Sequence, residues 1–133
     1  MQSAKLAKLL LQKAEQDRYV MNRLVDDPSA PDEVIGFHAQ QAAEKALKAW
    51  LVLLDVDYPL THSLFTLLNL LREAGADCAR YETLEGLTPY AVELRYGTAV
   101  TGAQVDPAAV APMIVELVAH VRELLEAAET EAQ

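Results

Sequence analysis

The sequence predicts an all-α protein, an antiparallel four-helix bundle with one extra short helix. Apolar residues recur at intervals of three and four along four long segments, which is the periodicity of a helix face. The composition agrees, because 52% of the 133 residues are hydrophobic but only 6% are aromatic. Five glycines are too few for a turn-dense β-protein, and no segment shows strand alternation. We therefore expect one helical domain over residues 1–133.

The first helix is expected from about Ser3 to about Asp26. It should end at Asp27–Pro31, because each proline disfavours helix in the residue before it. Asp17 falls inside the apolar side of this helix, where an unpaired charge would be costly. That side is predicted to consist of Leu6, Leu10, Ala14, Met21 and Leu24, with Leu9 and Val20 beside it.

The second helix should begin near Pro31 and continue to about Asp55. It has two distinct faces at about 100° per residue. The apolar face contains Ile35, Ala39, Ala42, Ala43, Ala46, Ala49, Trp50 and Leu53. The polar face contains Phe37, Gln41, Glu44, Lys45 and Lys48, with His38 at the border. We expect the alanine-rich face and the last helix to offer a second copy a packing surface.

Thr61 is predicted to cap a third helix from His62 to about Ala74. Residues 81–87 suggest a short helical turn, and Thr88–Pro89 should start a short helix that ends near Tyr96. A loop is expected over residues 97–105.

The last helix should begin at Asp106–Pro107, an N-cap followed by a first-turn proline. Its acidic end, residues 126–133, is expected to fray. Its apolar positions are Val110, Ile114, Leu117, Val121, Leu124 and Ala128.

The formal net charge of −9 argues against binding of long DNA or RNA through the general field of the protein. Cys78 is the one cysteine, so no internal disulfide is possible, which suits a reducing cytoplasm. No signal peptide is evident, and no run of about 18 apolar residues could span a membrane. A cytoplasmic location is therefore expected.

The segment Phe37–Ala49 resembles the central helix of HEPN domains, whose pattern is an aromatic residue, a Gln-Ala-x-Glu-Lys core and a second lysine. Three further features follow in the expected order. They are Ala14 with Asp17 as Ala-x-x-Asp, His62 with Leu64 as His-x-Leu, and Arg95–Tyr96 as the Arg-Tyr before the last helix.

The resemblance implies a helical bundle that is often a homodimer and binds nucleotides or RNA. It also implies pairing with a minimal nucleotidyltransferase, as in toxin–antitoxin systems. Some members are ribonucleases that use Arg-x(4–6)-His on one helix. None of His38, His62 and His120 has an arginine at that spacing, so we expect no strong ribonuclease activity and assign no catalytic residue.

Lys45 and Lys48 share one helix face and are the only lysines after Lys13, so they are candidates for holding phosphate. The alternative is an ordinary solvated face with a Glu44–Lys48 pair. The full predicted ligand site is Lys45, Lys48, His62, Arg95, Tyr96, His38 and Gln41. Two other functions stay open, a divergent metal-independent ribonuclease and a protein-interaction module without a ligand.

Arg95 has a structural alternative, because it could neutralise Asp17. His120 lies beside the last apolar stripe and is expected in the core or at an interface. No metal site and no cofactor are expected, because no His-x-x-His, Cys–His or glycine-rich phosphate motif is present.

Overall fold

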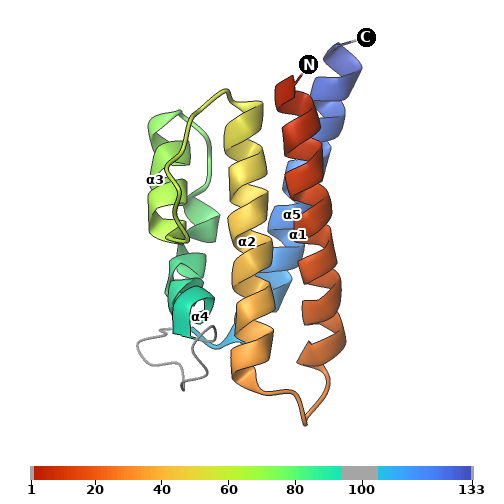
Figure 1. Cartoon of the computed structure of the whole chain (residues 1–133), viewed down its shortest axis with the longest axis vertical. Coiled ribbons are helices and arrows are strands. Elements are labelled where there is room, and N and C mark those ends of the chain that lie inside the picture. The colour runs from red at the N-terminus through yellow and green to blue at the C-terminus, as the bar shows by residue number, and fades with distance from the viewer. Residues whose placement is uncertain (1, 94–104, 133) are drawn as a thin grey trace.

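The computed structural model describes residues 2–93 and 105–132 (Figure 1). All of its regular elements are helical, so the predicted all-α class is confirmed. In chain order they are α1 (Gln2–Val25), α2 (Asp32–Leu53), α3 (Leu64–Glu73), the 3-10 helix η1 (Ala79–Leu87), α4 (Thr88–Glu93) and α5 (Pro107–Glu131).

The bundle is organised around α2, which contacts every other element. The two other long helices, α1 and α5, also contact each other. In Figure 1, α3 and α4 stand one above the other beside α2, so the shorter elements together fill the fourth position of the bundle. The start of α1 and the end of α5 lie at the same end of the molecule (Figure 1).

The alanine-rich face of α2 is buried inside the chain itself. Five alanines on it have no exposed surface: Ala39, Ala42, Ala43, Ala46 and Ala49. Small side chains at a contact let helix axes approach closely. The prediction that this face offers a second copy a packing surface is therefore wrong, because packing within the chain already covers it.

The buried side of α1 is rotated by about one residue from the predicted stripe. Ala14 and Met21 are in the core as expected, but Ala7 and Leu11 take the places predicted for Leu6 and Leu10. Leu6 is 45% exposed and Leu9 53% exposed. Three consecutive leucines at positions 9–11 satisfy either stripe, and the rotation seen here directs Ala7 and Ala14 into the core together with the alanines of α2.

The third helix begins later than predicted, because its N-cap is Ser63 and not Thr61. The Ser63 hydroxyl accepts a hydrogen bond from the Thr66 amide at 3.2 Å, while Thr61 accepts one from the Ser63 amide at 3.0 Å. The carbonyl of His62 accepts from the Gln40 side chain at 3.2 Å. His62 therefore precedes the helix and does not open it.

The helix ends of α2 and α3 use the same turn. After α2, the Val56 amide donates to the Leu51 carbonyl at 2.9 Å and the Asp55 amide donates to the Val52 carbonyl at 3.0 Å, which is a Schellman motif. The left-handed residue of this turn is Asp55, with a φ of 57°. In the corresponding turn after α3 that position is Gly75, with a φ of 87°.

The predicted turn at residues 81–87 is part of η1, and Thr88 is the first residue of α4. The Tyr90 ring of α4 packs directly on Gly36 of α2. A Cβ atom at Gly36 would lie 2.3 Å from Cδ1 of that ring, so only glycine permits this contact. The predicted end of the short helix near Tyr96, and most of the predicted loop, lie outside the described residues.

The start of α5 is as predicted, since the Asp106 carboxylate accepts from the Ala108 amide at 3.1 Å and Pro107 follows it. The helix continues to Glu131 and so includes most of the acidic segment for which fraying is expected. His120 is half-buried and packs edge-on against Trp50, at 5.0 Å between ring centres. In the part of the chain that is described, no helix is long and apolar enough to cross a membrane.

Candidate functional site

One side of α2 carries a row of polar side chains that are partly buried between neighbouring segments. His38, Gln41, Lys45 and Lys48 follow one another at intervals of three or four residues, so they share one side of the helix. The row contacts α1 through Asp17 and the segment before α3 through His62. The structure therefore brings together five of the seven predicted site residues.

The first half of the row is organised by Asp17 of α1. Its Oδ2 accepts a hydrogen bond from Nζ of Lys45 at 2.6 Å, and its Oδ1 lies 3.0 Å from Nδ1 of His38. The Asp17 side chain is only 13% exposed, so it needs these partners. Both carboxylate oxygens are engaged by residues of α2, while Arg95, the partner expected from the sequence, lies outside the described residues.

The second half is organised by Glu44, whose side chain is 7% exposed. Its Oε2 accepts from Nζ of Lys48 at 2.9 Å. Its Oε1 accepts from Nε2 of Gln40 at 2.9 Å and lies 3.0 Å from Nδ1 of His62. Burial alone would raise the pKa of Glu44, but the hydrogen bonds from Lys48, Gln40 and His62 outweigh it and hold the pKa below its ordinary value.

The two halves repeat one arrangement, in which a poorly exposed carboxylate lies between a lysine and a histidine. An ionised carboxylate can only accept, so Nδ1 of each imidazole carries the hydrogen and Nε2 is left for another partner. Lys45 and Lys48 are thus neutralised within the protein. The Glu44–Lys48 pair, expected as the alternative to a phosphate site, is therefore present.

Two buried polar residues were missed by sequence analysis. Glu44 was placed on the solvated face, and Gln40 was not considered, although both are buried. Gln40 also accepts from Nε2 of Gln41 at 2.7 Å, so it links the row to the carbonyl of His62. The sequence feature that could have revealed them is the spacing of four residues between Gln40 and Glu44, which lets their side chains meet on the helix.

The remaining two predicted site residues, Arg95 and Tyr96, lie outside the described residues. His62 contacts α2 through Glu44, from a position ahead of the helix that it was predicted to open. Among residues 2–93 and 105–132, no three His, Cys, Asp or Glu side chains gather in a metal-binding arrangement.

A scan against protein-family models matches the HEPN domain over residues 7–130. The chain belongs to the HEPN family. In general terms this makes it a nucleotide-binding or RNA-related module. Neither a search of curated proteins nor a search of solved structures finds a significant match.

In this HEPN domain, the sequence features that resemble the family pattern lie on α2 or contact it. The segment Phe37–Ala49, which carries the family pattern, is the middle of α2. Asp17 of α1 and His62 before α3, the two residues that resemble the family's acid and histidine in the sequence, both contact that segment. The residues of three separate sequence motifs therefore meet in two hydrogen-bonded clusters on one side of α2, one around Asp17 and one around Glu44.

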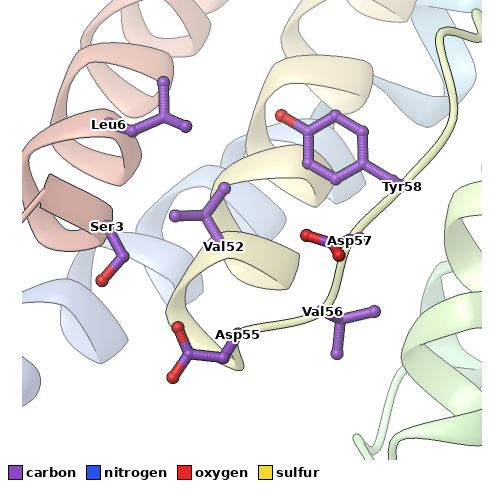
Figure 2. Close-up of a pocket in the computed structure, with 7 residues that line it drawn as sticks. All are labelled: Ser3, Leu6, Val52, Asp55, Val56, Asp57 and Tyr58. Atoms are coloured by element: carbon purple, nitrogen blue, oxygen red, sulfur yellow. The ribbon is translucent and has the colours of Figure 1, made fainter.

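A cavity of about 360 Å³ lies beyond Lys48 toward the end of α2 (Figure 2). Its lining comes from the start of α1, the last turn of α2 and the segment that follows: Ser3, Leu6, Val52, Asp55, Val56, Asp57 and Tyr58. Figure 2 shows Ser3 and Leu6 of α1 facing Asp57 and Tyr58 across Val52. The cavity adjoins the polar row, because the Lys48 ammonium lies 5.6 Å from the centre of the Tyr58 ring.

Proposed function

We propose that this HEPN domain binds the phosphate groups of a nucleotide or an RNA on the polar row of α2. The observation that carries the proposal is the pair of lysines three residues apart, each held beside a histidine by a shared carboxylate. Lys45 is 27% exposed and Lys48 is 15% exposed, so both can reach a ligand at the surface.

The arrangement supports binding by exchange of partners. A phosphate that attracts Lys48 weakens its bond to Glu44, and a buried carboxylate without a cation is costly. His62 already contacts the same carboxylate through Nδ1. His38 has the same relation to Asp17 and Lys45. The hydrogen bond from the histidine thus continues to hold the carboxylate while the lysine contacts the ligand.

This mechanism makes phosphate binding depend on the histidine beside each carboxylate. We expect inorganic tripolyphosphate to bind more tightly to the wild type than to the His62→Ala variant, in which Glu44 loses one of its hydrogen-bond donors. Calorimetric titration at a single pH measures both affinities. Equal affinity for the two proteins would contradict the exchange mechanism.

Arg95 and Tyr96 belong to the proposed site through their match to the family pattern, and a titration tests Arg95 together with Lys45. ATP should bind more weakly to the double variant Lys45→Ala, Arg95→Ala than to the wild type. Each lost charged hydrogen bond should cost about 1.5–3 kcal/mol. Unchanged affinity would refute this site. No binding of nucleotide or RNA to the wild type would instead favour a protein-interaction module.

The proposal extends to the setting of the domain. We propose that it acts in the cytoplasm, as a homodimer or with a minimal nucleotidyltransferase in a toxin–antitoxin-like pair. Since the alanine-rich face of α2 is covered, a second copy would have to use another surface. Light scattering at micromolar concentration tests self-association, and a clean monomer would refute the homodimer.

A second candidate function is a metal-independent ribonuclease, favoured by the contact of His62 with Glu44. A carboxylate on Nδ1 orients an imidazole so that Nε2 can exchange protons with a substrate, and the His62 side chain is 44% exposed. Incubation with labelled RNA separates the two functions. Robust cleavage that is lost in the His62→Ala variant would establish the enzyme, and intact RNA would leave the binding module.

A further inference from the structure

The cavity beside Tyr58 has carboxylates in its lining and a cation just outside it. Lys48 is not part of the lining, but its ammonium lies 5.6 Å from the centre of the Tyr58 ring, which is a cation–π distance. Within the lining, Asp55 and Asp57 contribute exposed carboxylates. Leu6 and Val52 form an apolar wall opposite the tyrosine (Figure 2). A ligand that matches this polarity is anionic at one end, flat and apolar in the middle, and a hydrogen-bond donor at the far end.

The spacing along α2 connects this cavity to the polar row. Val52 follows Lys48 by four residues and Lys45 by seven, so it lies about 6 Å and about 10 Å farther along the helix axis. Lys48 and Val52 are on the same side of the helix, because a separation of four residues returns nearly to the same direction. A molecule with its phosphates at the lysines therefore reaches the cavity with its other end.

We infer that this cavity receives the base of a nucleotide whose phosphates lie at Lys45 and Lys48, and that it selects bases with an exocyclic amino group. The inference rests on the proposed function. The volume of about 360 Å³ is within the range of roughly 300–1,000 Å³ typical of small-molecule sites. The Tyr58 ring provides an aromatic surface against which any base can lie. The carboxylates of Asp55 and Asp57 accept hydrogen bonds from an amino group and not from a carbonyl.

Titration of the full chain with three ligands separates the contribution of the base to the affinity from that of the phosphates. Inorganic tripolyphosphate carries only the phosphates, ATP adds a base with an amino group, and ITP replaces that amino group with a carbonyl. ATP should bind at least roughly 5-fold more tightly than tripolyphosphate, as expected when a base stacks on an aromatic side chain. ITP should bind more weakly than ATP.

A variant that fills the cavity with a larger side chain tests the same inference from the side of the protein. Leu6→Trp places a large side chain in the cavity from a residue that is already 45% exposed, and Leu9→Trp makes the same change one turn away, outside its lining. Leu6→Trp should reduce ATP affinity to that of tripolyphosphate and leave tripolyphosphate affinity unchanged. Leu9→Trp should change neither. Tyr58→Ala, which removes the aromatic wall, should lower ATP affinity in the same selective way.

The outcomes distinguish this inference from the function on which it rests. Tripolyphosphate that binds as tightly as ATP, or ATP affinity that survives both Leu6→Trp and Tyr58→Ala, would overturn the base site and leave the phosphate site standing. Absence of binding by both ligands to the wild type would overturn both. Circular dichroism of each variant verifies that it is folded before it is titrated.

Discussion

Replacement of Glu44 by glutamine is the sharpest test of the polar network. The Glu44 side chain is 7% exposed and is held by Lys48, Gln40 and His62. Glutamine keeps the shape but removes the charge, so the contact with Lys48 loses its charge-assisted strength. Losing one such bond costs about 1.5–3 kcal/mol of unfolding free energy. For a chain of this size, that corresponds to a decrease in melting temperature of roughly 5–15 °C.

The difference should depend on pH, because the fold lowers the pKa of Glu44 from its ordinary value of 4.5. A lowered pKa contributes stability above the unfolded value, and this contribution is lost as the pH falls through the folded value. Urea unfolding should therefore show a large difference in stability between wild type and Glu44→Gln at pH 7 and a smaller one at pH 3.

The control is Glu82→Gln, since Glu82 is half-exposed and pairs with Arg72 at the surface, where a pair is worth about 1 kcal/mol or less. Equal losses for the two variants at pH 7, or a loss for Glu44→Gln that is the same at both pH values, would refute the role assigned to Glu44.

Four substitutions test the local structure, each by thermal and urea unfolding. Gly36→Ala should destabilise the protein by about 1–3 kcal/mol, because the new Cβ overlaps the Tyr90 ring, and a wild-type melting curve would contradict that packing. Asp55→Gly should stabilise it by roughly 0.5–1 kcal/mol by relieving the left-handed backbone, so a loss of stability would mean that the aspartate side chain contributes to the turn. Ser63→Ala should cost about 1 kcal/mol and Thr61→Ala clearly less, and the reverse order would restore Thr61 as the N-cap.

The fold could be predicted because its signals are local. The proline and aspartate pattern at residues 106–107 predicts the start of α5, and the periodicity of α2 predicts which face is buried. The rotation of α1 could not be predicted, since leucines at positions 9, 10 and 11 fit two neighbouring stripes. The choice between them depends on packing against other helices, which a single sequence does not display.

For the described residues of the candidate site, the sequence predicted which ones lie close together but not the ion pairs that they form. The lysines and histidines were recognised from their residue types and their order along the chain. Their neutralisation depends on contacts over long sequence separations, such as Lys45 with Asp17 and His62 with Glu44. Glu44 looked solvated because its helix position lies on the polar face, and its contact with His62 comes from a segment that is 18 residues away in the sequence. The cavity next to Tyr58 had no sequence signal, because three separate segments form it.

The central claim is that Lys45 and Lys48 bind phosphate, and one matched titration tests it most directly. Tripolyphosphate is titrated by calorimetry into the wild type, into the double variant Lys45→Ala, Lys48→Ala, and into Lys8→Ala, Lys13→Ala. The control removes the same charge from two exposed lysines of α1 that form no ion pair among the described residues. We predict that the α2 variant loses at least roughly 10-fold in affinity and that the α1 variant changes little. Equal affinities for the two double variants would contradict a specific site on α2 and attribute the binding to net charge alone.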